Sequence, residues 1–321
     1  MRVMITGAAG FLGRRLTHEL IARGHLAGAD GTPRAISRLV LTDLGEVPPL
    51  PGGATALDVR RIQGDLADPG ILQELCAEPY DALFHLASQL TFHAEADPDL
   101  AWKINVAPFQ ALIGGAVSGA RVIFASSIAV FGGALPDVVD DSLAPLPQTT
   151  YGMHKAVNEL ILADASRHGR IDGRALRLPI VLIRPGMTQP VVSDQVAAIV
   201  REPLEGRAFA APLPGDLGVP VASAGAVVRG LIALHDVPRA ALPPKGALNL
   251  PALTVTVSEM QAAAQRAGAT GAMSCAPVPA TVEVVRGWPG RFVSRYAEGL
   301  GIGPDADFDA VIADYLAHRE G

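Results

Sequence analysis

Residues 2–6 read Arg-Val-Met-Ile-Thr and run directly into residues 7–13, Gly-Ala-Ala-Gly-Phe-Leu-Gly. The short apolar run predicts a β-strand, and the segment Phe11–Arg23 behind the glycines predicts an α-helix. A strand, a glycine-rich turn and a helix in this order are typical of the first βα unit of a dinucleotide-binding fold.

The three glycines each have a different physical purpose in such a turn. Gly7 permits the tight turn, Gly10 lets the backbone approach a pyrophosphate, and Gly13 lets the helix pack closely on the strand. The helix that opens with Phe11 and Leu12 directs its N–H groups and the positive end of its dipole at the phosphate charge. We expect these five residues to bind the cofactor. A glycine-rich turn without a ligand is the alternative.

Short apolar runs and longer helical patterns alternate through the rest of the first half. Strands are expected at 38–42, 59–63, 82–86, 121–125 and 174–182, and helices at 71–77, 97–117 and 149–168. This alternation predicts βαβ units and a parallel sheet that is covered on both faces. With right-handed crossovers, the result is a doubly wound α/β fold of the Rossmann type.

The pattern loosens after residue 185, where proline-rich pieces interrupt the helical segments. Helices are expected at 194–201, 224–234, 257–267 and 308–318, and a short strand at 247–250. We therefore expect residues 1–185 to form a dinucleotide-binding domain that also carries the catalytic residues. Residues 186–321 should form mainly a smaller, irregular substrate-binding lobe, with C-terminal segments able to return to the first domain.

Composition excludes several classes of protein. The 321 residues carry a net charge of −6, and a mildly acidic chain is poorly suited to bind nucleic-acid phosphates. The two cysteines, Cys76 and Cys275, form no CxxC pattern, which argues against a disulfide framework or a metal site and fits a cytoplasmic setting. No apolar segment reaches the roughly 18 residues that span a bilayer, so no membrane partner is expected.

Asp43 stands at the end of the strand expected at 38–42. A carboxylate there can accept hydrogen bonds from the ribose hydroxyls of an adenosine and repel a 2′-phosphate, which favours NAD over NADP. A capping aspartate in a loop is the alternative. Asp43 lies 30 residues beyond Gly13, whereas about 20 is usual. We interpret the excess, His25–Ser37, as a surface insertion.

Two other strand ends carry weaker signals. Asp65-Leu66 follows the third expected strand and would lie along the adenine, and Leu86-Ala87-Ser88 follows the fourth and would pass under the ribose and nicotinamide. Ordinary turn chemistry explains such residues equally well.

Tyr151 and Lys155 are four residues apart near the start of an expected helix, so their side chains share one face. A nearby ammonium favours the phenolate form of a tyrosine, which makes Tyr151 a usable general base. The chain has only four tyrosines and three lysines, so chance pairing at this spacing is improbable. The alternative is a pair on a surface helix.

Ser126 and Ser127 end the strand expected at 121–125. A hydroxyl at this position can donate a hydrogen bond to the substrate oxygen and stabilise developing charge. Both serines could also be ordinary strand-end hydroxyls. His85 is expected to be a core histidine with its hydrogen bonds satisfied. His154 is expected to pack or to be solvated, with a contact to the cofactor as the alternative.

Together these motifs resemble the extended short-chain dehydrogenase/reductase family, the NAD-dependent epimerase/dehydratase group. The resemblance covers at least residues 1–185 and includes Asn105 in KINV and the segment LPIVLIRPG at 178–186. It implies NAD as cofactor, Tyr151 as general base and Lys155 as its assistant. Ser127 is the strict match for the hydroxyl, with Ser126 close enough to share the site.

The same resemblance extends the expected cofactor site and the assembly. It places Asn105 in the cofactor site and Pro179-Ile180 against the nicotinamide carboxamide. It also implies a homodimer, because members of this family often pair through two helices.

The branch of the family is indicated by residues that differ from other members. The dehydratases carry an Asp-Glu pair where this chain has Ile128 and Ala129, so the carboxylates for water elimination are missing. Basic residues are sparse between 186 and 240, which counts mildly against a lobe that grips a nucleotide diphosphate. Arg201, Arg207, Arg229 and Arg239 are those present.

Three stretches of the second half, 184–190, 193–206 and 219–231, resemble a branch that oxidises a four-carbon sugar acid. The resemblance implies oxidation of the C2 hydroxyl of D-erythronate to the 2-keto acid with NAD. Arg184 could then bind the substrate carboxylate in bidentate fashion, although a structural salt bridge is an equal alternative. The expected substrate contacts are Ser88, Ser126, Ser127, Tyr151 and Arg184.

Two other functions remain open from the sequence. One is a nucleotide-sugar epimerase, which returns its NAD to the starting state. The other is a non-enzymatic redox sensor that keeps the dinucleotide fold, although the intact serine, tyrosine and lysine set argues against it.

Overall fold

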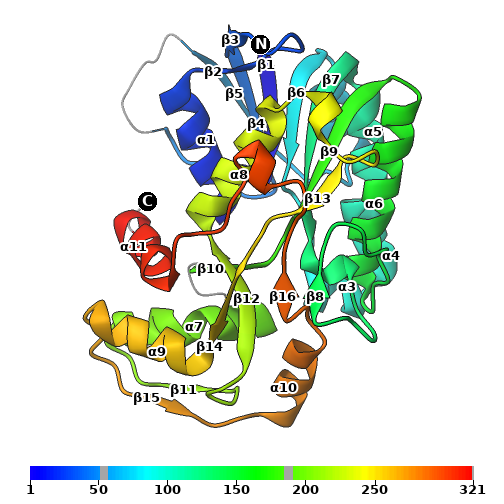
Figure 1. Ribbon diagram of the computed structural model, residues 1–321. Helices are drawn as coiled ribbons and strands as arrows, with labels where there is room; N and C mark the ends of the chain where they lie inside the picture. Colours follow the sequence, from blue (N-terminus) through cyan, green and yellow to red (C-terminus); the bar gives the residue numbers. More distant parts are fainter. Residues whose placement is uncertain (51–56, 184–190, 320–321) are drawn as a thin grey trace.

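The computed structural model describes residues 1–50, 57–183 and 191–319. Its centre is a seven-stranded sheet in the order β13-β9-β7-β6-β1-β4-β5, and neighbouring strands are parallel (Figure 1). The doubly wound fold expected from the sequence is confirmed. In chain order the strands are β1 (Arg2–Thr6), β4 (Arg38–Asp43), β5 (Asp58–Gln63), β6 (Tyr80–His85), β7 (Ala116–Ser127), β9 (Ile171–Leu178) and β13 (Ala247–Asn249).

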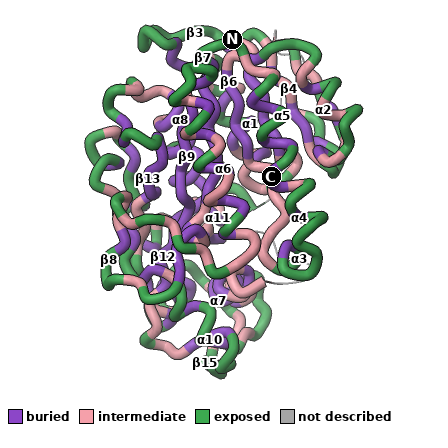
Figure 2. Tube along the Cα trace, turned by 90° about the vertical axis from the view of Figure 1, so that its right-hand side faces the viewer, coloured by how far each residue is buried: buried purple, intermediate pink, exposed green. Residues whose placement is uncertain are grey.

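Helices cover both faces of this sheet. Alternate residues of β1 divide between two hydrophobic cores, with Val3 and Ile5 in one and Met4 in the other. Strands that are buried on both faces need apolar residues throughout, and Figure 2 shows this burial along the sheet. One face is covered by α1 (Phe11–Arg23) and α8 (Ala224–Asp236), and the other by α2 (Pro69–Cys76), α5 (Ala107–Gly114) and α6 (Thr150–Arg167).

The order of the strands creates a switch point between β1 and β6. The chain moves outward from β1 through β4 to β5, and then returns to β6 and continues to β7 and β9 on the other side. Ligands of open α/β sheets bind where the strand order reverses, outside the carboxyl ends of the strands. Gly7 follows β1 and Leu86 follows β6 at this point.

The second half of the chain adds a smaller lobe with its own hydrophobic core (Figure 1). A three-stranded sheet, β10-β12-β14, lies at its centre. The strands of the lobe are β10 (Ile180–Leu182), β11 (Phe209–Ala211), β12 (Gly218–Ser223), β14 (Leu253–Thr256) and β15 (Met273–Cys275). The helices of the lobe are α7 (Val192–Leu204), α9 (Val257–Arg266), α10 (Pro279–Arg286) and α11 (Phe308–His318). The short pair β8 (Val138–Val139) and β16 (Arg291–Phe292) links the two halves of the sequence.

Two second-half segments return to the central sheet. β13 pairs with β9, where Ala247 lies opposite Ala175, and α8 packs on β7 and β9. The two halves of the sequence are therefore interleaved in space.

The single helix predicted at 97–117 is wrong. The structure has two helices, α4 (Pro98–Asn105) and α5, separated by Val106, and Val117 belongs to β7. Pro108 lies in the first turn of α5, where its missing N–H costs nothing. Inside one continuous helix, its ring would clash with the preceding turn. Asp97 caps α4, because its side chain accepts a hydrogen bond from Leu100 N at 3.0 Å.

The strand predicted at 174–182 is also divided. It forms β9 in the central sheet and β10 in the three-stranded sheet, with Pro179 between them. Proline cannot donate to a strand ladder, so the chain changes sheets at this residue. The helix α3 (Thr91–Ala96) was not predicted.

The insertion at 25–37 forms an antiparallel hairpin of β2 (His25–Ala27) and β3 (Pro33–Ala35). Leu26 and Ile36 are buried, so the segment is more than a surface loop. The N-terminal ammonium of Met1 donates to Ala35 O at 2.7 Å, which places the hairpin at the amino ends of the strands. It therefore lies at the opposite end of the sheet from Gly7.

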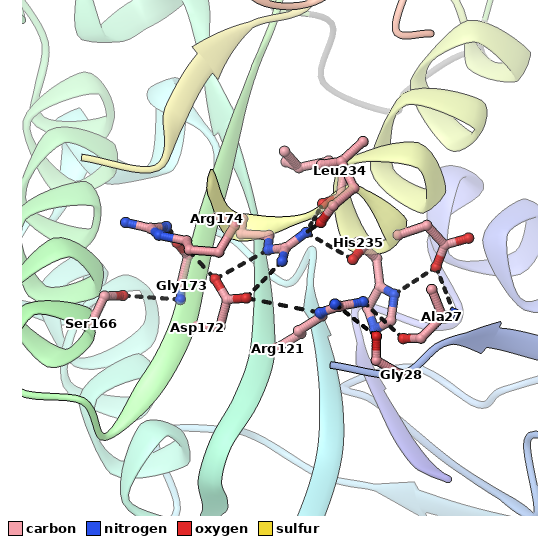
Figure 3. Close-up of polar contacts among 12 residues, drawn as sticks. Ala27, Gly28, Arg121, Ser166, Asp172, Gly173, Arg174, Leu234 and His235 are labelled. Carbon is pink, nitrogen blue, oxygen red and sulfur yellow. Dashed lines mark hydrogen bonds and ion pairs between the residues drawn. The ribbon is translucent and has the colours of Figure 1, made fainter. Parts of the chain in front are cut away.

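Two buried arginines fasten elements to this same amino-terminal end (Figure 3). The Arg174 side chain is fully buried, and its Nη1 donates to the carbonyl oxygens of Leu234, His235 and Val237 at the end of α8. Its Nη2 donates to Asp172 at 2.6 Å. Arg121 donates to the backbone oxygens of residues 27 and 28 in the hairpin, at 2.7 and 2.9 Å.

We expect Arg174→Met to lower the free energy of unfolding by more than about 3 kcal/mol, because three carbonyl groups would lose their buried donor and the half-buried Asp172 would lose its nearest cation. Urea denaturation followed by circular dichroism measures this change. Arg167→Met is the matched control: Arg167 pairs with Asp164 on an exposed helix surface, so its loss should cost at most about 0.5 kcal/mol. Equal losses in the free energy of unfolding for the two substitutions would contradict the stabilising role assigned to the buried Arg174.

Candidate active site

A pocket of about 900 Å³ lies at the carboxyl ends of β1, β6 and β7. The glycine loop forms one wall, the start of α6 forms another, and residues from α7 and the segment after α10 close the far side. Twelve residues singled out by the sequence line it: Gly7, Gly10, Phe11, Leu12, Gly13, Leu86, Ser88, Ser127, Tyr151, Lys155, Pro179 and Ile180.

The glycine loop has the shape that a pyrophosphate requires. Gly7 has φ +74°, and a Cβ added there would lie 2.7 Å from Ala87 N. A Cβ at Gly13 would lie 2.0 Å from the carbonyl oxygen of Gly7, so only glycine fits. Gly10 caps α1 without any side-chain hydrogen bond, and the first turn holds no acidic residue. The helix therefore presents backbone N–H groups and a positive dipole end, which fits the phosphates of NAD.

Asp43 lies beside the glycine loop, outside the pocket wall. Its Oδ2 accepts a hydrogen bond from Ala9 N and its Oδ1 one from Gly45 N, both at 3.0 Å. These bonds fix the carboxylate and leave further lone pairs for the hydroxyls of a ribose. The position fits NAD, because a 2′-phosphate would meet this negative charge.

Four other cofactor candidates do not line the pocket. Asp65 accepts a hydrogen bond from Ala67 N at 2.8 Å in the turn after β5, and Leu66 is buried. Ala87 N donates to Thr6 Oγ1 at 3.3 Å, which joins the ends of β1 and β6. Asn105 is buried and binds the loop beside the pocket, because its Oδ1 accepts from Gln89 N at 2.7 Å.

Tyr151 and Lys155 lie on one face of α6, and both line the pocket. Lys155 Nζ is 5.4 Å from the centre of the Tyr151 ring and donates to Ala125 O at 2.8 Å. The ammonium also lies 4.7 Å from the centre of the Phe124 ring. Burial lowers the pKa of Lys155 to about 7, and the carboxylate of Glu159 partly opposes this effect.

The two serines at the end of β7 have different surroundings. Ser127 is half-buried and lines the pocket, and its Oγ accepts a hydrogen bond from Ala129 N at 3.1 Å. Ser126 is buried, and its Oγ donates to Glu159 Oε1 at 2.6 Å. Consecutive strand residues point to opposite sides, so the geometry does not support Ser126 as a direct substrate contact. Arg184 lies outside the described residues.

The histidines are structural, as expected. His85 is buried, its Nδ1 lies 2.8 Å from Thr6 Oγ1, and burial together with Lys155 lowers its pKa to about 3. His154 is buried against the edge of Trp102, with its Nδ1 3.3 Å from Asn105 Nδ2.

The sequence did not identify several walls of the pocket. Gln195 on α7 lines it, and its Oε1 accepts a hydrogen bond from Thr281 Oγ1 on α10 at 3.3 Å. Gln195 lies in the stretch 193–206 that carries part of the family resemblance, but no spacing rule assigned it to the pocket, because it meets the catalytic pair only through the folding of the second half. The others are Leu90, Thr91, Phe92, Glu95 and Ala96 on or beside α3, and Val191, Val192, Ser193, Val284 and Trp288 from the second half.

The fold and this pocket define a dinucleotide-binding α/β protein with a tyrosine and a lysine beside the nicotinamide end of the expected site. Residues 3–243 match the NAD-dependent epimerase/dehydratase family, and the chain belongs to that family. NAD is accordingly its cofactor.

In the described residues, no cluster of three or more metal-ligating side chains is present. None of the described helices is long and apolar enough to cross a membrane.

Two curated relatives are similar over nearly their whole lengths. A D-erythronate dehydrogenase from Cupriavidus necator is 39% identical and covers 98% of each chain. A D-erythronate dehydrogenase from Haemophilus influenzae is 34% identical over 99% of each. Among solved structures, a nucleoside-diphosphate-sugar epimerase from Agrobacterium tumefaciens matches with a TM-score of 0.91 and 32% identity, over 100% of this chain and 95% of that one.

We expect Gly13→Ala to weaken binding of NAD at least about tenfold, because the added Cβ would push α1 away from the turn that holds the phosphates. Isothermal titration calorimetry measures the change. Gly114→Ala is the control, because a Cβ at Gly114 has no neighbour within 4 Å. Unchanged affinity in folded Gly13→Ala protein would refute this role of the loop.

A second prediction concerns pH and the buried lysine. The pKa of Lys155 is about 7 in the folded chain against an ordinary 10.5. Between these values the unfolded chain binds a proton that the folded chain lacks, so the stability of the wild type rises with pH across this window. Lys155→Met removes this group. The variant should be the more stable protein at about pH 6, and its advantage should shrink toward about pH 10.

Thermal melts of the two proteins across this range, without NAD, test the expectation. A difference in melting temperature that stays constant with pH would show that the folded protein does not lower the pKa of Lys155.

Proposed function

We propose that the protein is an NAD-dependent dehydrogenase that oxidises the C2 hydroxyl of D-erythronate to 2-dehydro-D-erythronate. The observation that carries the reaction class is the placement of Tyr151, Lys155 and Ser127 on one pocket with the glycine loop. The similarity to two D-erythronate dehydrogenases over nearly the whole chain supports the choice of substrate.

The proposed chemistry divides the two hydrogens of the alcohol. The reaction removes a proton from the C2 hydroxyl and a hydride from C2, and NAD when bound supplies the hydride acceptor. Tyr151 takes the hydroxyl proton as general base. The Lys155 ammonium favours the phenolate that this step requires.

Ser127 is proposed to orient the reacting oxygen. Its Oγ accepts the backbone N–H of Ala129, so its own proton remains available for donation to the substrate oxygen. This hydrogen bond would stabilise negative charge as the proton moves to Tyr151. Ser88 lines the same pocket and is proposed as a further substrate contact.

The carboxylate of a sugar acid requires a donor of its own. Arg184 stays the candidate from sequence alone, because residues 184–190 lie outside the described part of the chain. A homodimer and a cytoplasmic location also stay predictions.

An epimerase acting on a nucleotide sugar is the second candidate, favoured by the solved epimerase of the same fold at 32% identity. Ile128 and Ala129 line the pocket where the dehydratases carry carboxylates, so water elimination is not proposed. Cofactor behaviour separates the two remaining functions. A dehydrogenase releases NADH at each turnover, whereas an epimerase gives no net NADH.

The decisive experiment combines purified protein with NAD and, separately, D-erythronate, L-erythronate, D-threonate and L-threonate. We expect NADH absorbance to rise with D-erythronate. Tyr151→Phe should lower kcat by roughly 10²- to 10⁴-fold, because it removes the general base. Tyr296→Phe is the matched control, because Tyr296 does not line the pocket.

Absence of NADH with all four acids would overturn the dehydrogenase assignment. Incubation with UDP-glucose and analysis of the sugar product would then test the epimerase.

A further inference from the structure

A buried ion pair lies one helical turn beyond the catalytic lysine. Glu159 follows Lys155 by four residues on α6, so the two side chains share a face of the helix. The Glu159 carboxylate accepts hydrogen bonds from Arg177 Nε at 2.9 Å and from Arg177 Nη2 at 2.7 Å. Ser126 Oγ donates to the same carboxylate at 2.6 Å.

Arg177, the partner of Glu159, is also buried and makes contacts with two further residues. It lies on β9 with 4% of its surface exposed, and its guanidinium is 5.0 Å from the centre of the Phe131 ring. Its Nη1 lies 3.5 Å from Asn249 Oδ1 on β13. The pair therefore joins α6, the end of β7 and β9 beneath the pocket floor.

Such a pair is hard to explain as a source of stability. Removing two charges from water costs several kcal/mol for each ion, and apolar residues of similar size often replace a buried pair without loss. Its position is informative, because two of its neighbours belong to the candidate catalytic set or lie next to it. Glu159 follows Lys155 by one helical turn on α6, and Ser126, which donates to Glu159, directly precedes Ser127 in the chain.

We propose that Glu159 and Arg177 are positioning residues that set the charge environment of Lys155 and fix the strand end that presents Ser127. The inference rests on the proposed function, because it assigns roles around that function's catalytic residues. Neither side chain lines the pocket, so both act through their neighbours.

The electrostatic balance around Lys155 can be followed group by group. On α6 itself, Glu159 supplies a negative charge, and Tyr151 and His154 are its other titratable neighbours. His85 on β6 is neutral, because burial and Lys155 lower its pKa to about 3. Arg177 on β9 adds a positive charge, while β7 contributes the uncharged Phe124 and Ala125. The Glu159 carboxylate is thus the one negative charge near two cations, Lys155 and Arg177. Arg177 donates hydrogen bonds to both of its oxygens.

This balance predicts opposite effects for the two halves of the pair. Glu159→Gln removes the charge that favours the ammonium, so the pKa of Lys155 should fall by about 1 pH unit or more. Arg177→Met removes a neighbouring cation and frees the carboxylate for Lys155, so the pKa of Lys155 should rise by a similar amount. Mere loss of structure would not produce shifts of opposite sign.

The chain suits a direct measurement, because it has only three lysines, Lys103, Lys155 and Lys245. Protein labelled with ¹³C-lysine can be titrated by NMR through the Cε resonances, without NAD or substrate. Comparison with Lys155→Met assigns the signal. Asp172→Asn is the matched control, because it breaks the ion pair with Arg174, and Asp172 lies near the start of β9, roughly 16 Å along the strand from Arg177. It should lower the melting temperature and leave the pKa of Lys155 unchanged.

Shifts of the Lys155 pKa in the same direction, or none in folded variants, would overturn the inference. If Arg177→Met does not fold, Glu159→Gln alone tests the inference, and an unshifted pKa of Lys155 in that variant overturns the inference.

In active enzyme, Glu159→Gln should lower kcat roughly 10- to 100-fold with little change in KM for NAD, because Ser127 and Lys155 are misplaced rather than the cofactor.

The two proposals fail separately. A wild-type protein that makes no NADH from any acid, but shows the opposite Lys155 shifts, refutes the dehydrogenase and keeps the positioning pair. NADH formation by a protein whose variants leave the pKa of Lys155 unshifted supports the dehydrogenase and refutes the positioning pair.

Discussion

Helix α1 can approach strand β1 as closely as it does because position 13 has no side chain. A Cβ there would lie 2.0 Å from the carbonyl oxygen of Gly7, a separation that real atoms do not tolerate. This contact sets the N-terminus of α1 at the end of β1, where the strand order reverses. Asp43 and Ala87 then take their places against the same turn, one through Ala9 N and the other beside Gly7. The cofactor end of the pocket is thus fixed by backbone approach more than by any side chain.

Buried charge serves two different purposes at the two ends of β9. Toward the amino end, Arg174 of β9 and Arg121 of the neighbouring β7 donate to backbone carbonyl groups and so hold α8 and the β2–β3 hairpin against the sheet. At the carboxyl end, Arg177 donates to a carboxylate that also faces a buried lysine. The first arrangement satisfies groups that folding would otherwise leave without partners. The second leaves one ammonium incompletely compensated, which is the condition in which a lysine can change protonation near neutral pH.

Local rules were enough to predict the parts of the site that lie within one motif. The glycine turn and the spacing of Tyr151 and Lys155 depend on neighbours in the sequence, and the structure brings these residues to one pocket. Rules of periodicity failed where a single residue changed the course of the chain, as Pro108 did in the predicted long helix and Pro179 in the predicted long strand. The ion pair of Glu159 with Arg177, and the wall that includes Trp288, depend on contacts between distant segments, and no spacing rule encodes them.

The three residues of β13 have a consequence for how this protein can be divided. They close the edge of the sheet beside β9, and they come from far along the chain, as does α8 over the adjoining face. A fragment cut near residue 185 would keep the complete nucleotide-binding motif yet expose an open strand edge and an apolar surface, both of which promote aggregation. The halves are therefore not interchangeable modules. New substrate preferences must arise through changes made in place, within a chain whose second half also completes the fold of the first.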